Sequence, residues 1–344
     1  MELTNKIKMN KLPFFIVLLY IFTNCSKDSY DTEPTNYIYH YPTEEATITA
    51  SQIGIGNGTL EPKGIAISNE KLYVCNGDVL EVFNAITLEY IKTITNYTKG
   101  NTIIPLTNLS SVCIDKGRIY LGSVDSRLFV IDENTSAGIS TVGNGQWWNT
   151  FVHVFGVVVK DGLVFVKEKN TTIKVFETSQ ITDTSNWNIT PIAKLNTLNG
   201  GTEIYSMDID FGNLVVAGRD AKSFLYYKID DIRANATNSL TTPIKPVTHL
   251  FSDSKPISIS FSTDWAITME NTGSLYYLRL YPKEEFSSKN YNSRVNASDI
   301  MGQNRFGSIV STAQLNDRIF LADNTNKKIR VIKINQSTIA EQKN

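Results

Sequence analysis

The stretch that decides the fold is Val112-Cys113-Ile114-Asp115-Lys116-Gly117-Arg118-Ile119-Tyr120-Leu121. Two short apolar runs, Val112–Ile114 and Ile119–Leu121, flank the polar turn Asp115–Gly117. Short runs of β-branched and aromatic residues bounded by turn residues are typical of strands. Asp and Gly tolerate the positive φ of tight hairpin turns. The stretch therefore predicts a β-hairpin.

The same hairpin pattern recurs six times along the chain. When the central residue of its second run is taken as a reference, the six reference residues are Tyr73, Tyr120, Phe165, Val215, Ile267 and Phe320. They are separated by 47, 45, 50, 52 and 53 residues. A third alternating run follows each hairpin, and a fourth, weaker run closes most units, as in Glu89–Ile94. Four short strands in each of several long repeats are typical of β-propeller blades. The sequence thus predicts an all-β fold, a six-bladed β-propeller with four-stranded blades.

The two ends of the array predict how the ring closes. The last unit has no convincing fourth strand, because residues 335–344 are polar, whereas the strand-like run Ala46–Ala50 precedes the first unit. We expect this N-terminal strand to complete the last blade, since closure removes exposed sheet edges. The predicted propeller covers residues 46–335 and is followed by a C-terminal tail over 336–344. A seven-bladed ring with one degenerate blade is the alternative.

One unit resembles a known repeat. The segment from Phe320 to Val331 reads apolar residues, Ala-Asp, a polar turn with Asn, then Lys-Ile-Arg-Val, and in this it resembles an NHL repeat. The segment from Leu72 to Phe83 is a looser version, and the other units match only by pattern. The resemblance implies a six-bladed NHL-like propeller. It implies no particular activity, because one fold carries many functions.

The N-terminus has the composition of a targeting segment. Lys6, Lys8 and Lys11 lie before or at the start of the apolar run Leu12–Phe22. A helix of that length covers only about 16 Å, roughly half of a bilayer core, so the run is too short for a membrane span. A basic region followed by a short apolar region is typical of a secretory signal peptide. We place this signal peptide at residues 1–24.

The residues that end this segment, Phe22-Thr23-Asn24-Cys25, resemble the lipobox of Gram-negative bacterial lipoproteins. The resemblance implies lipid attachment at Cys25, and the multiple acyl chains of such proteins give stable membrane anchoring. The polar residues 25–45 would then form a flexible tether. By the same resemblance, Ser26 favours an outer membrane lipoprotein, facing the periplasm or exposed at the cell surface. Plain secretion with an incidental cysteine is the alternative.

Composition and charge narrow the classes of function. The 344 residues are 41% hydrophobic and 19% charged, which excludes a disordered or fibrous chain and permits a packed core. Lys and Arg number 33 against 34 Asp and Glu, so there is no basic excess with which to neutralise a phosphate backbone. We therefore expect no nucleic acid partner. We expect the protein to be a monomer.

Candidate site residues follow from the repeat. In a propeller, the first strand of every blade starts at one mouth of the central channel. The residues twelve positions before the reference residues are Glu61, Asn108, His153, Glu203, Lys255 and Ser308. All are polar, and the simplest interpretation is a hydrated channel mouth. Six-bladed lactonases and related hydrolases hold a divalent cation at this place, which implies Glu61, Asn108 and Glu203 as ligands for Ca²⁺. Lys255 would oppose a cation there.

Two adjacent tryptophans form a second candidate. Trp147 and Trp148 lie between amides and glycines in a loop that should open on the same face as the channel mouth. Paired exposed aromatic residues suit stacking on sugar rings or anchoring a protein partner. A structural role, filling the gap between two blades, is the alternative.

The cysteines and the motif search complete the prediction. Cys75 and Cys113 lie in adjacent units, so either a disulfide or two buried thiols fits an oxidising compartment. The sequence contains no nucleophile elbow, zinc-protease or phosphate-loop motif in a fitting context. We therefore expect a non-catalytic binding or scaffold lipoprotein, without a cofactor, whose loop face contacts a glycan, a peptide or an envelope protein. The alternative is a metal-dependent hydrolase or lactonase.

Overall fold

The computed structural model describes residues 36–53, 58–145, 150–169, 172–182, 188–196, 204–218, 222–236, 244–246, 248–252, 254–273, 275–288, 295–296 and 306–340. The chain forms two compact units. The larger unit is His40–Gln336, and the smaller one includes the first residues of strand β1 and the last residues of strand β26. The predicted signal peptide and Cys25 lie outside the described residues. Among those that are described, no helix is long and apolar enough to cross a membrane.

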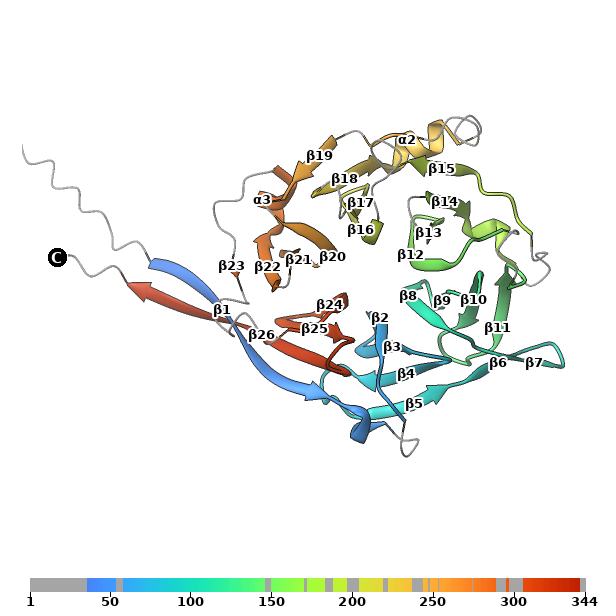
Figure 1. The fold of residues 1–344 in the computed structure, drawn as a ribbon, viewed down its shortest axis with the longest axis horizontal. Coiled ribbons are helices and arrows are strands. Elements are labelled where there is room, and N and C mark those ends of the chain that lie inside the picture. The colour runs from blue at the N-terminus through green and yellow to red at the C-terminus, as the bar shows by residue number, and fades with distance from the viewer. Residues whose placement is uncertain are drawn as a thin grey trace, which may run out of the picture. The chain divides into compact units, whose positions relative to one another are not determined.

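The larger unit consists of six four-stranded antiparallel sheets, which Figure 1 shows arranged in a ring. Blade 1 contains β2 (Pro62–Ser68), β3 (Lys71–Asn76), β4 (Val79–Asn84) and β5 (Tyr90–Ile94). Blade 2 contains β8 (Leu109–Asp115), β9 (Arg118–Ser123), β10 (Arg127–Asp132) and β11 (Gly138–Val142). Blade 3 contains β12 (Val154–Lys160), β13 (Leu163–Glu168), β14 (Thr172–Glu177) and β15 (Ala193–Asn196).

The second half of the ring follows the same order. Blade 4 contains β16 (Ile204–Asp210), β17 (Asn213–Gly218), β18 (Ser223–Lys228) and β19 (Thr248–Phe251). Blade 5 contains β20 (Lys255–Phe261), β21 (Trp265–Thr272), β22 (Leu275–Pro282) and β23 (Val295–Asn296). Blade 6 contains β24 (Ile309–Leu315), β25 (Arg318–Asp323), β26 (Lys328–Ala340) and β1 (Asn36–Ile48). The first strands β2, β8, β12, β16, β20 and β24 are called the inner strands below.

Blade 6 closes the ring through the N-terminal strand. Strand β1 lies beside β26 and is the outermost strand of that sheet, which confirms the predicted closure and the six blades. The strand begins at Asn36, ten residues before the predicted Ala46, so residues 36–45 belong to a strand rather than to the predicted tether. Two of its polar residues contact the other strands of blade 6: Glu44 forms an ion pair with Arg330, and Glu45 forms one with Arg318. Strand β26 likewise continues to Ala340, past the predicted end of the propeller at residue 335.

The hydrophobic core is divided among the six joints between neighbouring blades. Each of the six buried apolar clusters combines residues from two adjacent blades. Alternation along one strand distributes side chains between two joints: Leu72 and Val74 pack toward blade 6, whereas Tyr73 and Cys75 pack toward blade 2. The joint between blades 6 and 1 includes Ile48 from β1. Since this joint exists only in a closed ring, Ile48 of β1 is buried at the joint that closes it.

Several short elements lie outside the blades. A separate hairpin, β6 (Asn96–Lys99) and β7 (Thr102–Pro105), follows blade 1, and its buried Tyr97 packs against Phe129 of blade 2. Two one-turn segments, η1 (Ala50–Gln52) and η2 (Thr178–Gln180), are 3₁₀-helical. Two short α-helices, α2 (Ile229–Ala234) and α3 (Lys283–Ser288), follow third strands in blades 4 and 5.

The two described cysteines are free thiols. Cys75 belongs to the cluster between blades 1 and 2, whereas Cys113 packs against the cluster between blades 2 and 3. The thiols therefore face different joints, and the predicted alternative of a Cys75–Cys113 disulfide is wrong. Burial raises the pKa of the Cys113 thiol to about 12, which keeps it protonated and unreactive.

Candidate functional site

The predicted mouth residues lie where the repeat places them, at the starts of the inner strands. Glu61, Asn108, His153 and Ser308 directly precede β2, β8, β12 and β24, and Lys255 is the first residue of β20. Glu203 lies outside the described residues. We call this end of the ring the mouth. Contacts with neighbouring loops hold its residues in place.

Glu61 and Asn108 are occupied by protein partners. Glu61 Oε1 lies 3.0 Å from Lys327 Nζ, and the backbone N–H of Glu61 donates to Asn76 Oδ1. Asn108 donates from Nδ2 to the Asp125 carboxylate at 2.9 Å. Asn108 thus presents its N–H₂ group to Asp125, and Glu61 faces the Lys327 ammonium group. Because Glu203, the third residue of the implied Ca²⁺ ligand set, lies outside the described residues, that set stays a prediction. The described residues contain no group of three or more His, Cys, Asp or Glu side chains placed to hold a metal.

His153 has a structural contact as well. Its Nδ1 donates to the Val124 carbonyl, which can only accept, so Nδ1 carries the proton. Its backbone N–H donates to Ser126 Oγ at 3.2 Å, and its φ of 55° turns the chain into β12. The imidazole is therefore held in a fixed orientation at the mouth.

A position that we did not single out in the sequence holds the loops of the mouth. It lies three residues after each reference residue, at the end of the second strand, and five of the six residues there are polar: Asn76, Ser123, Glu168, Glu270 and Asp323. Three of them accept the backbone N–H of the segment that leads into the inner strand, from Glu61 to Asn76, from Val152 to Glu168 and from Gly307 to Asp323. The sequence does indicate this position, because polar residues recur there in strands that are otherwise largely apolar.

Three of these acids are paired with a base on the third strand of the same blade. Glu168 lies 2.8 Å from Lys174, Glu270 lies 2.8 Å from Arg279, and Asp323 lies 2.7 Å from Arg330. Glu270 is fully buried and also accepts hydrogen bonds from Thr268 and Tyr281. Buried and paired in this way, the three acids fix the mouth loops.

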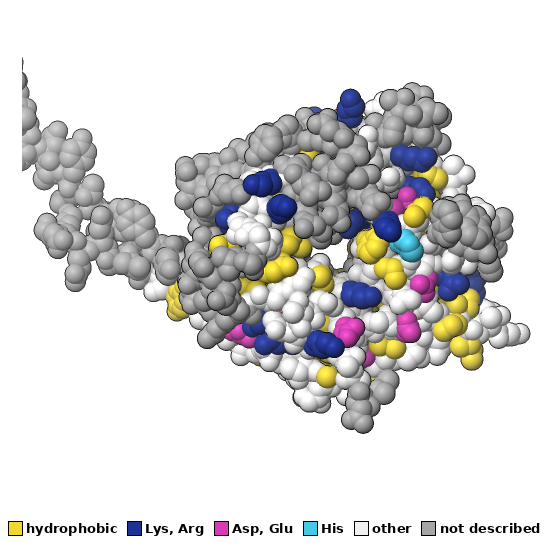
Figure 2. Space-filling model, viewed as in Figure 1, with side chains coloured by type: hydrophobic (Ala, Val, Ile, Leu, Met, Phe, Trp, Pro, Cys, Tyr) yellow, Lys and Arg dark blue, Asp and Glu magenta, His cyan; other side chains and the backbone are white. Residues whose placement is uncertain are grey.

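Blade 3 presents an exposed apolar surface at the mouth, beside a lysine that is 7% exposed. Val152 is 37% exposed and Phe155 is 39% exposed. The ring centroids of His153 and Phe155 are 6.3 Å apart, and Lys167 Nζ lies 5.5 Å from the Phe155 centroid. Val152, His153, Phe155 and Lys167 are called the blade-3 patch. Figure 2 shows hydrophobic side chains, a histidine and Lys or Arg side chains gathered beside the central opening.

The predicted tryptophan pair is close to this patch in the sequence. Trp147 and Trp148 lie outside the described residues, four to five positions before Val152. Of the loop that contains them, Gly143, Gly145 and Thr150 are described, and Gly143 and Gly145 both have positive φ.

Behind the mouth, the inner strands surround a cavity of about 410 Å³. A ring of small residues lies nine positions before the reference residues, and all of its members except Ser258 line the cavity: Gly64, Ser111, Gly156, Ser206, Ser258 and Ser311. Contacts across the joints involve this ring. Ser258 Oγ lies 3.1 Å from Thr312 Oγ1, and Ser311 Oγ accepts from the Ile65 amide at 3.2 Å. A Cβ on Gly64 would lie 2.4 Å from Ser111 Cα, so glycine permits the close approach of β2 and β8.

Asp208 is the carboxylate of the cavity wall. It lies on β16, and its two oxygens accept from the backbone amides of Ile209 at 2.8 Å and Phe261 at 2.7 Å, the latter on the next inner strand. Burial raises the pKa of this carboxyl to about 6, although both backbone hydrogen bonds act in the opposite direction. An ionisable residue between the apolar residues Met207 and Ile209 of one strand was the sequence indication of this position.

The ring of six four-stranded sheets defines the class of protein: this is a β-propeller. No family model and no curated protein matches the chain. Among solved structures, it is similar to a chain of the "Crystal Structure of Mitotic Checkpoint Complex", with a TM-score of 0.53 and 11% identity over 84% of this chain and 94% of the other.

It is also similar to the structure described as "Crystal structure of WD40 beta propeller domain of Doa1", with a TM-score of 0.51 and 12% identity over 86% of this chain and 97% of the other. At this identity the likeness shows the fold alone. The second of these neighbours is described as a WD40 propeller, and the resemblance of this chain to NHL repeats stays a prediction.

Proposed function

We propose that this chain is a non-catalytic binding scaffold, a β-propeller held at a membrane by a lipid on Cys25. In this proposal the mouth face binds a glycan, a peptide or an envelope protein through the blade-3 patch. The residue after the lipidated cysteine supports an outer membrane location, with the ring on the periplasmic side or at the cell surface. Between Cys25 and strand β1 lie residues 26–35, which in extended form would reach at most about 35 Å.

The observation that carries the proposal is an exposed aromatic side chain on a rigid backbone. Phe155 lies on the inner strand β12, and the segment before it is fixed by the hydrogen bond from Val152 to Glu168. Binding therefore orders little additional chain, which lowers its entropic cost. Aromatic side chains next to a basic group are enriched in binding sites, since they combine a large apolar area with polar contacts at the rim.

The opposite end of the ring offers a matched control. Phe211 lies in the turn after β16 and is 73% exposed, more than Phe155. Its ring is stacked against Lys283, whose Nζ lies 4.5 Å from the centroid. Phe211 thus has the same side chain and a comparable cationic neighbour, but it lies at the end of an inner strand and not at the mouth.

Photo-cross-linking in producing cells tests the proposal. Benzoylphenylalanine replaces Phe155 in one full-length variant and Phe211 in the other, and both are irradiated in intact cells. We expect a discrete adduct from position 155 and none from position 211. Protease and glycosidase treatment of that adduct separates a protein partner from a glycan. Adducts from position 211 alone, equal adducts from both, or none from position 155 would contradict binding through the mouth.

A further inference from the structure

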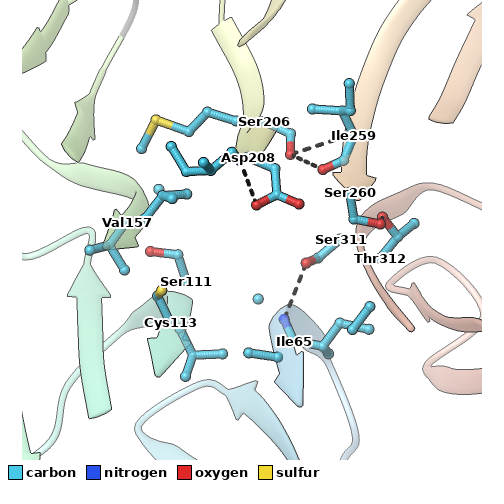
Figure 3. A pocket seen from close by; sticks show the side chains of 18 of the residues that line it. Ile65, Ser111, Cys113, Val157, Ser206, Asp208, Ile259, Ser260, Ser311 and Thr312 are labelled. Atoms are coloured by element: carbon cyan, nitrogen blue, oxygen red, sulfur yellow. Dashed lines mark hydrogen bonds between the residues drawn. The ribbon is translucent and has the colours of Figure 1, made fainter. Parts of the chain in front are cut away.

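The cavity contains a carboxylate whose charge is not neutralised by a nearby cation. Figure 3 shows the Asp208 carboxylate pointing into the space between the inner strands. Both of its hydrogen bonds come from uncharged backbone amides, of Ile209 and Phe261. Within the described part of the chain, no Lys, Arg or His nitrogen lies within 4.0 Å of it. A carboxylate in such a place favours a cation that enters from solvent.

The charged groups around Asp208 do not replace that cation. Lys283, on α3, is directed to Asp210 at 3.7 Å and donates to the Ser262 carbonyl at 3.0 Å. Asp210 adds negative charge from the same strand as Asp208. Across the cavity, on β8, Cys113 is a protonated thiol, and Lys160 lines the far end with an exposed side chain.

Hydroxyl groups of the wall can accept hydrogen bonds from an ammonium group. Figure 3 shows the Ser311 hydroxyl pointing into the same space as Asp208. The hydroxyls of Ser260 and Thr312 lie 2.9 Å apart on the neighbouring strands β20 and β24. An ammonium group has three donors and no acceptor, and the carboxylate and hydroxyl oxygens that line this cavity can accept from it. Among the described residues Asp208 supplies the one carboxylate of the lining, so Ca²⁺ would have to take most of its six to eight oxygen ligands from uncharged groups and water.

We propose that the cavity of the ring binds a primary ammonium group at Asp208, supplied by a free alkylamine or by a lysine side chain. The volume of about 410 Å³ leaves room for the attached alkyl chain. Phe155 of the blade-3 patch lines the same cavity, but Asp208 lies on β16 in blade 4, so the Asp208→Asn variant and the cross-linking at position 155 test the two proposals separately.

Titration of the full-length protein with small amines tests the proposal. The probes are putrescine and Nα-acetyl-lysine amide at pH 7.5, and binding is followed by calorimetry. Nα-acetyl-norleucine amide is the neutral control, because it has the same alkyl length without the charge. We expect both amines, or one of them, to bind and the neutral analogue not to bind. Binding of putrescine alone indicates a free amine, and binding of the lysine amide alone indicates a protein side chain.

Two further comparisons assign the binding to Asp208. Asp208→Asn should weaken it at least tenfold, whereas Asp161→Asn, an exposed carboxyl on the turn after β12, should leave it unchanged. The wild-type protein gives the same test without a substitution. With a pKa of about 6, Asp208 is mostly protonated at pH 5 while the probes keep their charge, so affinity should fall about tenfold from pH 7.5.

Three results would overturn the proposal. They are binding of the neutral analogue with the affinity of the amines, unchanged affinity in Asp208→Asn or at pH 5, and no binding of either amine to the wild-type protein.

Discussion

Replacement of Arg330 by methionine should lower the free energy of unfolding by about 3–5 kcal/mol, because it leaves a buried carboxylate without its charge partner. Arg330 is 4% exposed and Asp323 is fully buried. Arg330 Nε donates to Asp323 at 2.7 Å, and its NH1 donates to Glu44 of β1 at 3.1 Å. Although burial opposes it, hydrogen bonds from Asn326 and Arg330 hold the pKa of Asp323 below its ordinary value. One substitution thus removes contacts within blade 6 and to the closing strand.

An exposed ion pair on the same strand provides the control. Lys333 on β26 lies 3.6 Å from Asp317, and both side chains are largely exposed. Lys333→Met should change the free energy of unfolding by less than about 1 kcal/mol, as exposed pairs do. Denaturant unfolding of the wild type and both variants measures the difference. Equal losses in Arg330→Met and Lys333→Met would show that the buried arginine does not hold the closing blade together.

Gly64→Ala should destabilise the protein by about 3 kcal/mol, the upper end of what added volume costs in a packed region. The new Cβ would lie 2.4 Å from Ser111 Cα, 2.9 Å from Val112 N and 3.0 Å from Ser110 O. All three atoms are backbone atoms of β8, so no side-chain rotation relieves the contact. The inner strands of blades 1 and 2 would have to separate at the small-residue ring.

Gly156→Ala is the matched control for that prediction. Gly156 occupies the same repeat position in blade 3, but its Cβ would meet the Lys167 side chain at 3.3 Å. The nearest atom is Lys167 Cβ, which is attached to the backbone of β13, but a contact of 3.3 Å requires a shift of only a few tenths of an ångström, so we expect a loss below about 1 kcal/mol. Thermal unfolding of both variants gives the comparison. If Gly156→Ala is destabilised as much as Gly64→Ala, the close approach of β2 and β8 is not what excludes a side chain at position 64.

The repeat pattern predicted the blades because each second strand is buried on both faces. The reference residues Tyr73, Phe165 and Phe320 lie within β3, β13 and β25, as the hairpin pattern required. The first part of β1 was missed because its strand character comes from a partner almost three hundred residues away. In the sequence alone, Glu44 and Glu45 are typical of a solvated tether. Only the folded structure brings Arg330 and Arg318 of blade 6 beside them.

The candidate site was only partly predictable. The repeat spacing placed Glu61 and Asn108 at the mouth. It does not reveal that Glu61 pairs with Lys327 or that Asn108 donates a hydrogen bond to Asp125. Those partners belong to other loops, and tertiary geometry alone brings them together. The small residues of the inner strands were visible in the sequence at one repeat position, as in Gly64 and Ser311. They were missed because we searched for reactive side chains rather than for close backbone contacts.

Closure of the ring by β1 is the central claim, since both the mouth and the cavity depend on a complete circle of blades. Hydrogen–deuterium exchange of the full-length protein, read by mass spectrometry, tests it on peptides covering Tyr41–Ile48. If β1 pairs with β26, amides that donate across this pairing should be protected to a degree similar to those of Ile329–Ile334 in β26. Exchange of Tyr41–Ile48 at the rate of an unstructured chain, with the six blades otherwise protected, would contradict the closure.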